Sequence, residues 1–473
     1  MLNIEDTICA PATVPGTGAI AIIRMSGKDS FRIADKVVSC KGSTISETEG
    51  YMLRYGVALE ADGTDLDTVL VSVFRSPHSY TGEDSVEISC HSSKFVVERL
   101  LQRLVDSGAR MAGPGEFTQR AFVNGKMDLA QAEAVADVIS SQNAAAHRVA
   151  YSQLKGGFSK ELKTLRDELL KMTSLLELEL DFSEEDVEFA SRRELSALLD
   201  GALRHIHSLT DSFRYGNALR NGVPVAIVGA VNAGKSTLLN ALVGDDRAIV
   251  SDIAGTTRDT VEETMTIGGH LFRFIDTAGL RTTQDEVEKI GISRSYKKMS
   301  EAEIVLALLD VTVPEEENEH SISDIVNNLD VKSQKLIVLL NKVDVLSSNI
   351  NVSLLNNTVS SPDEKVTKLY ISAKTGFGLD TLRTLLSDSQ KTATLDSGQT
   401  IVTNLRHYQS LMSAAASLEK VRSSLTTSLT TSQTPDLLSE DLRQALHHLS
   451  SILGEVTPDE VLGNIFERFC VGK

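Results

Sequence analysis

The 473-residue chain has little cysteine, no long apolar run and a shortage of positive charge, and each scarcity excludes a class of protein. Its four cysteines, Cys9, Cys40, Cys90 and Cys470, are too few for a disulfide framework and lack the spacing of a metal site. No apolar run reaches bilayer-spanning length, and residues 1–6 lack the basic start of a signal peptide. We therefore expect a cytoplasmic protein without membrane association.

Positive charge is scarce: 47 Lys and Arg residues stand against 65 Asp and Glu residues, a formal net charge of −18. This balance disfavours broad electrostatic binding of RNA, so an RNA substrate would need a local basic patch or a second protein to hold it. Tryptophan is absent, and hydrophobic residues make up 41% of the chain, which is ordinary for a soluble protein. The chain is too long for one core, and we expect two or three domains.

The most informative segment is a phosphate-binding loop. Residues 229–236 read Gly-Ala-Val-Asn-Ala-Gly-Lys-Ser, between an apolar run at 223–228 and a helix-compatible run at 237–242. Its glycines let backbone N–H groups surround phosphate oxygens at a helix N-terminus. Lys235 would reach the β- and γ-phosphates, and Ser236 would bind Mg²⁺. The structural alternative is a glycine-rich turn before a helix.

Three further short motifs follow in the order that GTPases use. Asp276-Thr-Ala-Gly279, Asn341-Lys-Val-Asp344 and Ser372-Ala-Lys374 each follow an apolar run that predicts a strand. Each motif alone is weak, since a plain turn has similar residues. Open α/β sheets bind ligands at the carboxyl ends of their strands, so the four segments together predict one nucleotide site in a Ras-like G domain.

The chemistry of these motifs selects GTP. Asp276 would hold Mg²⁺ through a water molecule, and the Gly279 N–H would sense the γ-phosphate. The Asp344 carboxylate can accept hydrogen bonds from N1–H and the 2-amino group of guanine, donors that adenine does not offer. The Ala373 N–H is placed to donate to guanine O6.

The segment at 251–259 lies between the phosphate loop and Asp276, as a switch region does. Thr257 would complete the Mg²⁺ shell, with Thr256 beside it. The nucleotide contacts expected in all are Asn232, Ala233, Gly234, Lys235, Ser236, Thr237, Ser251, Asp252, Ile253, Ala254, Gly255, Thr256, Thr257, Asp276, Thr277, Ala278, Gly279, Asn341, Lys342, Asp344, Ser372, Ala373 and Lys374.

The group that orients the attacking water is not obvious from the motifs. Ras-like proteins carry a glutamine after Asp-x-x-Gly, but Leu280 holds that position here and cannot hydrogen-bond water. Asp285, Glu286 and Glu288 follow in a charged stretch. Either one of these side chains orients the attacking water, or the stretch is only a solvated acidic loop.

Segments outside these motifs carry a more specific resemblance. They are Asp6-Thr-Ile-Cys-Ala-Pro-Ala-Thr13, Arg24-Met-Ser-Gly27, Tyr80-Thr-Gly-Glu-Asp84, Gly113-Pro-Gly-Glu-Phe-Thr-Gln-Arg-Ala-Phe122, Lys126-Met-Asp-Leu-Ala-Gln-Ala-Glu-Ala134 and Phe469-Cys-Val-Gly-Lys473. With these segments, Asn232 in the phosphate loop and the long Gly255–Asp259 switch, the chain resembles the bacterial MnmE (TrmE) family of tRNA modification GTPases. The resemblance covers nearly the whole chain.

The resemblance implies that K⁺ sits beside the phosphates and supplies the positive charge that an arginine finger supplies elsewhere. By position its ligands are the Asn232 side chain, the carbonyls of Ser251 and Ile253, and Thr256. Glu288 matches the family's water-positioning glutamate, and with Lys235 it forms the expected catalytic pair of the G domain.

One departure from the family lies in the phosphate loop. The family often carries proline just before the loop asparagine, whereas Ala230-Val231 precede Asn232 here. The loop would be less rigid, but Asn232 and Lys235 stay in register.

The resemblance also implies a folate site in the N-terminal part. By position Arg24, Glu87, Lys126 and the C-terminal Lys473 match folate-contacting residues, and a carboxylate and cations suit a pterin edge and a glutamate tail. Without the resemblance, Arg24 and Glu87 would be ordinary charges at strand ends. Cys470 is either a catalytic thiol in one-carbon chemistry or a small buried residue of the tail.

The expected fold is a multidomain α/β protein. A β-rich folate-binding and dimerisation domain covers 1–122, with strands near 19–25, 68–74 and 85–89. Apolar spacing predicts helices over 128–154, 159–180, 192–209, 403–425 and 436–453, which form one bundle from segments 123–219 and 389–473. A Ras-like G domain is inserted at 220–388, with linkers near 214–221 and 387–398.

The function implied by the resemblance is K⁺-dependent GTP hydrolysis in tRNA modification. The chain would act as a homodimer with the flavoprotein MnmG (GidA) on the wobble uridine, U34. The product would be a 5-carboxymethylaminomethyl or 5-aminomethyl uridine, built with a one-carbon unit from a methylenetetrahydrofolate or related folate. Two alternatives stay open: a ribosome-assembly GTPase of the Era or Der kind, and a GTP-gated scaffold without catalysis at the folate site.

Overall fold

The computed structural model describes residues 6–181, 192–230, 232–244, 262–275, 299–330, 334–346, 359–360, 366–391, 400–427, 435–456, 459–467, 469 and 472. The chain divides into two compact units. The first holds residues 1–140, 150–205 and 410–473, and the second holds residues 141–149 and 206–409. The expected finer division into four segments stays a prediction.

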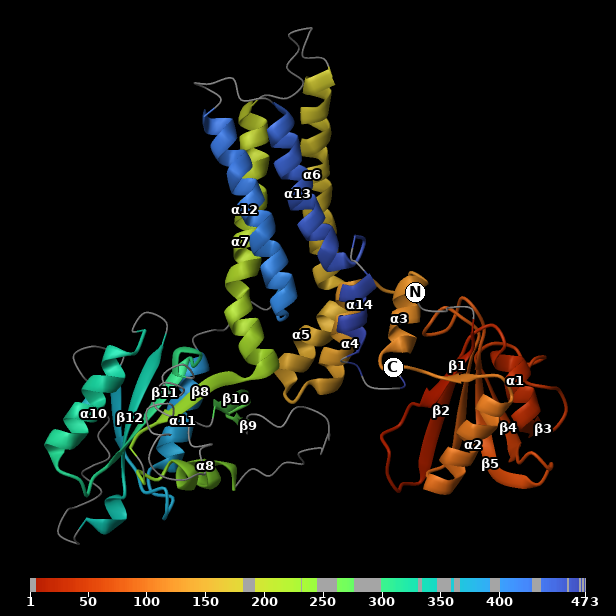
Figure 1. Ribbon diagram of the computed structural model, residues 1–473, viewed down its shortest axis with the longest axis horizontal. Helices are drawn as coiled ribbons and strands as arrows, with labels where there is room; N and C mark the ends of the chain where they lie inside the picture. Colours follow the sequence, from red (N-terminus) through yellow and green to blue (C-terminus); the bar gives the residue numbers. More distant parts are fainter. Residues whose placement is uncertain are drawn as a thin grey trace. The chain divides into compact units, whose positions relative to one another are not determined.

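The N-terminal part of the first unit contains a seven-stranded sheet in the order β3-β4-β5-β6-β2-β1-β7 (Figure 1). Alternating apolar residues build its strands, as in β5, where Val69, Val71 and Val73 all point into the core. The three strands predicted in this part are confirmed. Its elements are β1 (Ile8–Pro11), β2 (Ile20–Ser26), α1 (Ser30–Val37), β3 (Val38–Cys40), β4 (Met52–Leu59), β5 (Asp65–Phe74), β6 (Ser85–His91), α2 (Lys94–Asp106), β7 (Arg110–Met111) and α3 (Glu116–Val123).

The two faces of this sheet differ. Helices α1 and α2 pack against one face and close an apolar core with the strands. On the other face the strand register aligns Tyr55, Leu70, Ser89 and Ile22 across β4, β5, β6 and β2. Tyr55 and Leu70 are 60% and 42% exposed, so this face presents apolar side chains to solvent.

The helix predicted over 128–154 is wrong as a single element. The structure has α4 (Leu129–Ser140) and α5 (Ala144–Leu154), separated by three residues. The Asn143 side chain accepts a hydrogen bond from the Ala146 N–H at 2.8 Å, which caps a new helix instead of continuing the first. The spacing of apolar residues continues across the break, so periodicity alone does not detect it.

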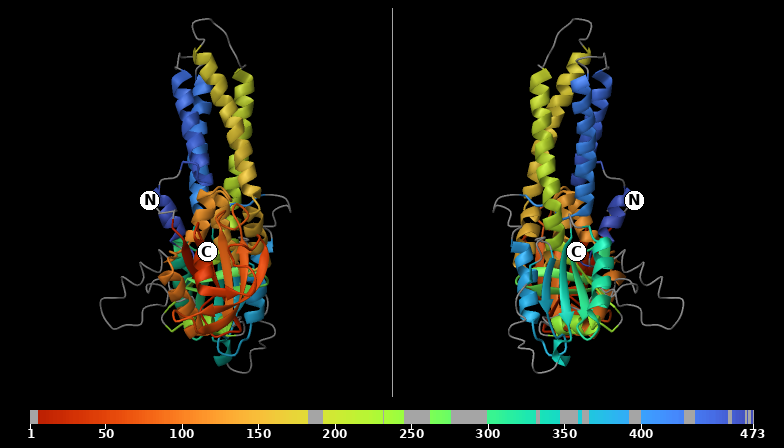
Figure 2. Two further views of the ribbon diagram at one scale, coloured as in Figure 1. Left: turned by 90° about the vertical axis from the view of Figure 1, so that its right-hand side faces the viewer. Right: turned by 90° about the vertical axis from the view of Figure 1, so that its left-hand side faces the viewer.

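The long helices of the first unit lie side by side as a bundle, which Figures 1 and 2 show from three sides. Residues 206–221 of α7 and 405–409 of α12 belong to the second unit. Helix α6 packs along α13, and leucines at helical spacing (Leu162, Leu165 and Leu169) are fully buried. The helices that apolar spacing predicts in this part are confirmed. Their bounds are α6 (Gly157–Asp181), α7 (Arg192–Asn221), α12 (Leu405–Thr427) and α13 (Pro435–Leu453).

Helix α7 runs through the linker that the sequence predicts at 214–221, so that prediction is wrong. Side chains in the last turns of α7 are buried, with Ala218 7% and Leu219 6% exposed. This packing stabilises the helix up to its last residue. Gly222, at φ 81°, then ends the helix one residue before the first strand of the second unit.

The C-terminal segment packs against the N-terminal part of its own unit. Helix α14 (Asp459–Phe466) contacts α3. Gly115 has φ 66°, and a Cβ atom there would lie 2.6 Å from the Phe466 carbonyl oxygen. A Cβ atom at Gly472 would lie 2.1 Å from the Pro11 carbonyl oxygen, so both positions require glycine for this close approach.

The second unit is built on a sheet in the order β13-β14-β12-β11-β8-β10-β9. The five strands from β14 to β10 are parallel, and the edge strands β13 and β9 are antiparallel. Helices α8 and α11 cover one face, and α10 covers the other. The elements are β8 (Val223–Val228), α8 (Lys235–Val243), β9 (Glu262–Ile267), β10 (His270–Ile275), β11 (Ile304–Asp310), α10 (Glu315–Asn327), β12 (Lys335–Asn341), the 3₁₀ turn η2 (Val343–Val345), β13 (Val359–Ser360), β14 (Val366–Tyr370) and α11 (Leu379–Lys391).

The expected fold class is confirmed by these elements. A β-rich N-terminal part, a helical part drawn from two chain segments and an inserted sheet with helices on both faces are all present. The parallel strands direct their carboxyl ends to one edge of the inserted sheet, which is where ligands bind in such folds.

Candidate functional site

Three of the expected nucleotide motifs meet at this edge of the second unit's sheet. The phosphate loop follows β8, the Asn341–Asp344 motif ends β12, and the Ser372–Lys374 motif follows β14. Parallel pairing of β8 with β11, β11 with β12 and β12 with β14 brings these ends to the same side. Segments more than 100 residues apart in sequence therefore form one site.

The phosphate loop has the backbone that its glycines permit. Gly229 and Gly234 have φ 155° and 100°, and Asn232 has φ 64°. A Cβ atom at Gly229 would lie 2.2 Å from the Leu308 carbonyl oxygen. Helix α8 begins at Lys235, so the backbone N–H groups of its first turn point toward the loop. This is a cradle that fits phosphate oxygens.

Lys235 lies back across its own loop. Its Nζ donates hydrogen bonds to the carbonyl oxygens of Gly229 at 2.7 Å and Ala230 at 2.9 Å. The Ser236 and Thr237 side chains are exposed at the start of α8. The ammonium is therefore held at the loop, within reach of the space that phosphates would fill.

Asn341 ties the phosphate loop to the Ser372–Lys374 motif. Its Nδ2 donates to the Ala233 carbonyl oxygen at 2.8 Å, and its Oδ1 accepts from the Ala373 N–H at 2.9 Å. The side chain is buried. The Ala373 N–H, expected to contact guanine O6, thus has Asn341 as its partner in this structure, and its contact with guanine stays a prediction.

Asp344 is oriented by the neighbouring motif. The Ser372 hydroxyl donates to Asp344 Oδ1 at 2.6 Å, and the Thr375 N–H donates to Ser372 Oγ at 3.2 Å. Ser372 is fully buried, while Lys374 is exposed. One carboxylate oxygen is therefore fixed by the protein, which leaves the other free of that bond for a ligand.

Lys342 has a partner that sequence reasoning missed. Its Nζ lies 2.5 Å from Oδ2 of Asp310, the last residue of β11. Burial tends to raise the pKa of the Asp310 carboxyl, but hydrogen bonds from Lys342 and Thr312 outweigh it and hold that pKa below its ordinary value. The signal in the sequence was an aspartate directly after the buried run at 304–309.

Part of the expected site lies outside the described residues, and the roles given to it stay predictions. Of the expected Mg²⁺ and K⁺ ligands, the structure describes Ser236 and Asn232, both exposed at the phosphate loop. Among the described residues, no group of three or more His, Cys, Asp or Glu side chains gathers as a metal site. The expected residues that lie outside are Ser251, Asp252, Ile253, Ala254, Gly255, Thr256, Thr257, Asp276, Thr277, Ala278, Gly279, Glu288, Cys470 and Lys473.

In the first unit, strand register brings Arg24 and Glu87 together. They face one another on β2 and β6, with Arg24 Nη2 2.8 Å from Glu87 Oε1. The guanidinium carbon lies 5.4 Å and 5.8 Å from the ring centroids of Tyr80 and Phe117. The two side chains are 19% and 25% exposed, so they are a half-buried pair backed by aromatic rings.

The other expected folate residues lie on nearby segments of the same unit. Arg24 Nη1 donates to the Gly472 carbonyl oxygen at 3.3 Å, which places the residue before Lys473 at the Arg24–Glu87 pair. Lys126 is exposed, and its Nζ donates to the Pro77 carbonyl oxygen at 2.9 Å. A carboxylate, a guanidinium and aromatic rings are a donor set that fits a pterin-like ring system.

A buried ion network supports this part of the first unit, and the sequence did not reveal it. Arg120 is 2% exposed and is within 3.3 Å of carboxylate oxygens of Asp6, Glu83 and Glu116. Burial tends to raise the pKa of the Glu116 carboxyl, but hydrogen bonds from Arg110, the Gly113 N–H and Arg120 lower it overall. The available signal was the spacing of Glu116 and Arg120, an acidic and a basic residue four positions apart on one helix.

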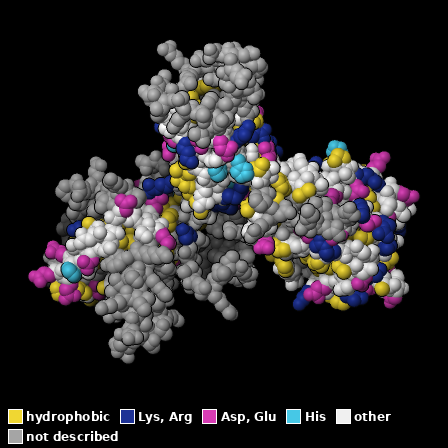
Figure 3. Space-filling model, turned by 45° about the horizontal axis from the view of Figure 1, so that its top comes forward, with side chains coloured by type: hydrophobic (Ala, Val, Ile, Leu, Met, Phe, Trp, Pro, Cys, Tyr) yellow, Lys and Arg dark blue, Asp and Glu magenta, His cyan; other side chains and the backbone are white. Residues whose placement is uncertain are grey.

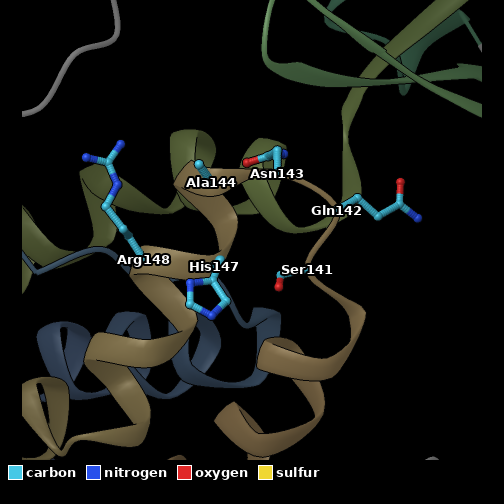
Figure 4. A pocket seen from close by; sticks show the side chains of 6 residues that line it. All are labelled: Ser141, Gln142, Asn143, Ala144, His147 and Arg148. Atoms are coloured by element: carbon cyan, nitrogen blue, oxygen red, sulfur yellow. The ribbon is translucent and has the colours of Figure 1, made fainter. Parts of the chain in front are cut away.

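A cavity of about 700 Å³ opens at the start of α5 (Figure 4). In Figure 4 the His147 and Arg148 side chains point in different directions, so they do not converge on one ligand. We assign the cavity no part in nucleotide or folate binding. The described residues that line it are Ser141, Gln142, Asn143, Ala144, His147 and Arg148.

Among the described side chains visible in Figure 3, neither sign of charge forms a large field. On the face shown in Figure 3, Lys and Arg side chains are interspersed with Asp and Glu side chains. Within the part of the chain that the structure describes, no helix combines the length and apolar character needed to cross a bilayer.

Comparison with known proteins gives matches along the whole chain. The family model "GTP-binding protein TrmE N-terminus" matches residues 7–126, and "MnmE helical domain" matches residues 129–470. Proteins named tRNA modification GTPase MnmE are similar: one from Parabacteroides distasonis (50% identity over 471 residues), one from Bacteroides thetaiotaomicron (48% over 471) and one from Flavobacterium johnsoniae (48% over 477). These alignments cover 99 to 100% of this chain and 100% of each relative. The chain therefore belongs to the MnmE (TrmE) family of tRNA modification GTPases.

Proposed function

We propose that this protein hydrolyses GTP in the modification of the tRNA wobble uridine. The observation that carries the proposal is the meeting of the phosphate loop with the Asn341–Asp344 and Ser372–Lys374 motifs at one edge of a parallel sheet. The names of the full-length relatives support the same activity.

Each described residue has a defined task in this proposal. The N–H groups at the start of α8 and the Lys235 ammonium bind phosphate oxygens, and Asp344 recognises the guanine edge. The Ser236 hydroxyl would hold Mg²⁺, which screens the phosphate charge during transfer. Glu288 would position the attacking water.

K⁺ would be held by Asn232 together with Ser251, Ile253 and Thr256, and it would supply positive charge beside the phosphates. We expect Asn232→Ala to lose stimulation of GTP hydrolysis by K⁺ and to keep nucleotide binding. Asn232 has φ 64°, so Asn232→Gly serves as a second variant that removes the ligand without backbone strain. A normal K⁺ response in both variants refutes this ligand.

The second part of the proposal concerns the one-carbon unit. A reduced folate would bind at the Arg24–Glu87 pair, with Lys126 and Lys473 reaching its charged tail. The contact between Gly472 and Arg24 supports this, because it puts the residue before Lys473 beside the pair. Cys470 would then lie near the folate, and full tRNA modification by Cys470→Ser in cells would remove any catalytic role for its thiol.

The proposed assembly is a homodimer that works with the flavoprotein MnmG. The exposed apolar face of β4 and β5, with Tyr55, Leu53 and Leu70, supports self-association through the N-terminal part. The mixed surface charge supports a role for the partner in holding tRNA.

The experiment that tests the function is mass spectrometry of tRNA nucleosides from cells that lack the protein. We expect loss of the 5-substituted wobble uridines and their return when the intact gene is restored. Unchanged nucleosides would withdraw the modification role and favour ribosome assembly. Failure to bind a reduced folate, with modification intact, would refute the folate part alone.

A further inference from the structure

We propose that Asp310 is a positioning residue for the nucleotide base. It would fix Lys342 as one wall of the base site and so set the affinity for purine nucleotides without selecting among purines. The inference deepens the proposed GTP site and rests on it. Neither Asp310 nor Lys342 lies on the phosphate loop. Their effect on nucleotide affinity is therefore separate from phosphate binding.

The pair is built by strand register. Asp310 ends β11 and pairs directly with Asn341, the last residue of the parallel neighbour β12. Lys342 follows with φ 70°, a left-handed conformation that a lysine rarely adopts and that a surrounding contact must hold. The contact present is the bond between Lys342 Nζ and Asp310 Oδ2 at 2.5 Å, with the side chains 33% and 14% exposed.

Asp310 is itself held in place, so it can act as a fixed anchor. Its Oδ1 accepts hydrogen bonds from the Thr312 N–H at 2.9 Å and the Thr312 hydroxyl at 2.6 Å, which leaves Oδ2 for Lys342. Its backbone oxygen accepts from Asn318 Nδ2 of α10 at 3.0 Å. The carboxylate cannot rotate without breaking a bond on one oxygen or the other.

The consequence for a ligand follows from where Lys342 stands. It lies between Asn341, which is tied to the phosphate loop, and Asp344, which is oriented by Ser372. With the ammonium anchored at Asp310, the four methylenes of Lys342 form a fixed apolar strip beside the base. This strip would contact the face of the purine ring, which is the same in all purines. Asp344 would instead bond the edge of the base, where purines differ.

The test measures equilibrium binding of GTP and inosine triphosphate, which lacks the 2-amino group, to the full-length protein. We expect Asp310→Asn to weaken both nucleotides by the same factor, about tenfold, because it removes one charge-assisted hydrogen bond. Thr312→Val removes only the hydroxyl bond to Asp310. It should weaken the binding of GTP and inosine triphosphate by the same factor, and by a smaller factor than Asp310→Asn does. Asp324→Asn on the exposed face of α10 makes the same chemical change and should alter neither.

Lys342→Met separates the possible failures. If Asp310 acts through Lys342, the double variant Asp310→Asn, Lys342→Met binds no more weakly than Lys342→Met alone. Fully additive effects, or a loss that differs between GTP and inosine triphosphate, overturn the inference. If Lys342→Met leaves the binding of both nucleotides unchanged, the inference fails and the proposed GTP site stands. If the unaltered protein itself does not bind GTP, the proposed site fails.

Discussion

The side-chain amide of Asn341 donates a hydrogen bond to the Ala233 carbonyl oxygen at 2.8 Å, although the two residues are 108 positions apart in the chain. The bond joins the loop that would bind phosphates to the loop that would bind the base. Because Asn341 is buried and both its amide atoms are used, a shift of either loop breaks a bond that water cannot easily replace.

Gly234→Ala should weaken GTP binding roughly tenfold to a hundredfold. A Cβ atom at Gly234 would lie 2.5 Å from Asn341 Nδ2, so the amide must move and lose its bond to the phosphate loop. Gly269→Ala is the matched control, since Gly269 has a similar left-handed backbone (φ 84°) with no atom within 4 Å of a new Cβ. Titration of a fluorescent GTP analogue checks both variants, and equal losses would show that backbone strain alone is responsible.

Glu87→Gln should lower the affinity for a reduced folate by about tenfold while leaving the unfolding midpoint nearly unchanged. The charge that orients Arg24 is removed, but glutamine keeps a hydrogen-bond acceptor for the guanidinium, and the pair is only partly buried, so the change in stability is small. Glu60→Gln is the control, because Glu60 pairs with Arg99 of α2 at 2.7 Å in the same N-terminal part and is not one of the expected folate contacts. Calorimetric titration with 5-formyltetrahydrofolate measures the affinity of both variants. A normal affinity in Glu87→Gln would contradict the folate site.

Glu116→Gln should destabilise the first unit at neutral pH by about 3 kcal/mol, because it removes one of the three carboxylates around the buried Arg120 and a partner of Arg110. The pKa of Glu116 lies below its ordinary 4.5 in the folded protein, so its stabilising contribution is complete above that pH and is lost as the pH falls through the lowered value. The difference in urea unfolding free energy between wild type and variant should therefore shrink in acid. Glu98→Gln, at a largely exposed carboxylate, should change little at any pH.

Gly216→Ala should destabilise the second unit by about 2 kcal/mol, although alanine is the better helix former. Helix α7 passes close to the chain at 401–402, and a Cβ atom at Gly216 would lie 2.1 Å from the Val402 carbonyl oxygen. Gly201→Ala in the same helix has no heavy atom closer than 4.0 Å and should stabilise by roughly 0.5–1 kcal/mol. Thermal unfolding of the two variants tests this, and stabilisation by both would show that the approach at Gly216 is not tight.

Much of the fold was predictable because element type follows local pattern. Alternation marked β5 and β6, and apolar spacing marked α6, α12 and α13. Two errors share one cause: the break between α4 and α5 and the continuation of α7 through 214–221 are both set by packing and capping, which periodicity does not report. Three expected nucleotide motifs were found at strand ends, as their neighbouring apolar runs predicted.

The sequence by itself determined the family and predicted which residues carry chemistry, because the phosphate loop, the Asn341–Asp344 motif and the family segments are short stretches recognised by residue type and spacing. Only the tertiary structure decided which of these residues contact one another. The Arg24–Glu87 pair, the anchor of Lys342 on Asp310 and the bridge from Asn341 to Ala233 each join residues far apart in the chain. Such pairs depend on strand register and on the order of strands in a sheet, which are fixed by the packing of the whole core and not by any single segment.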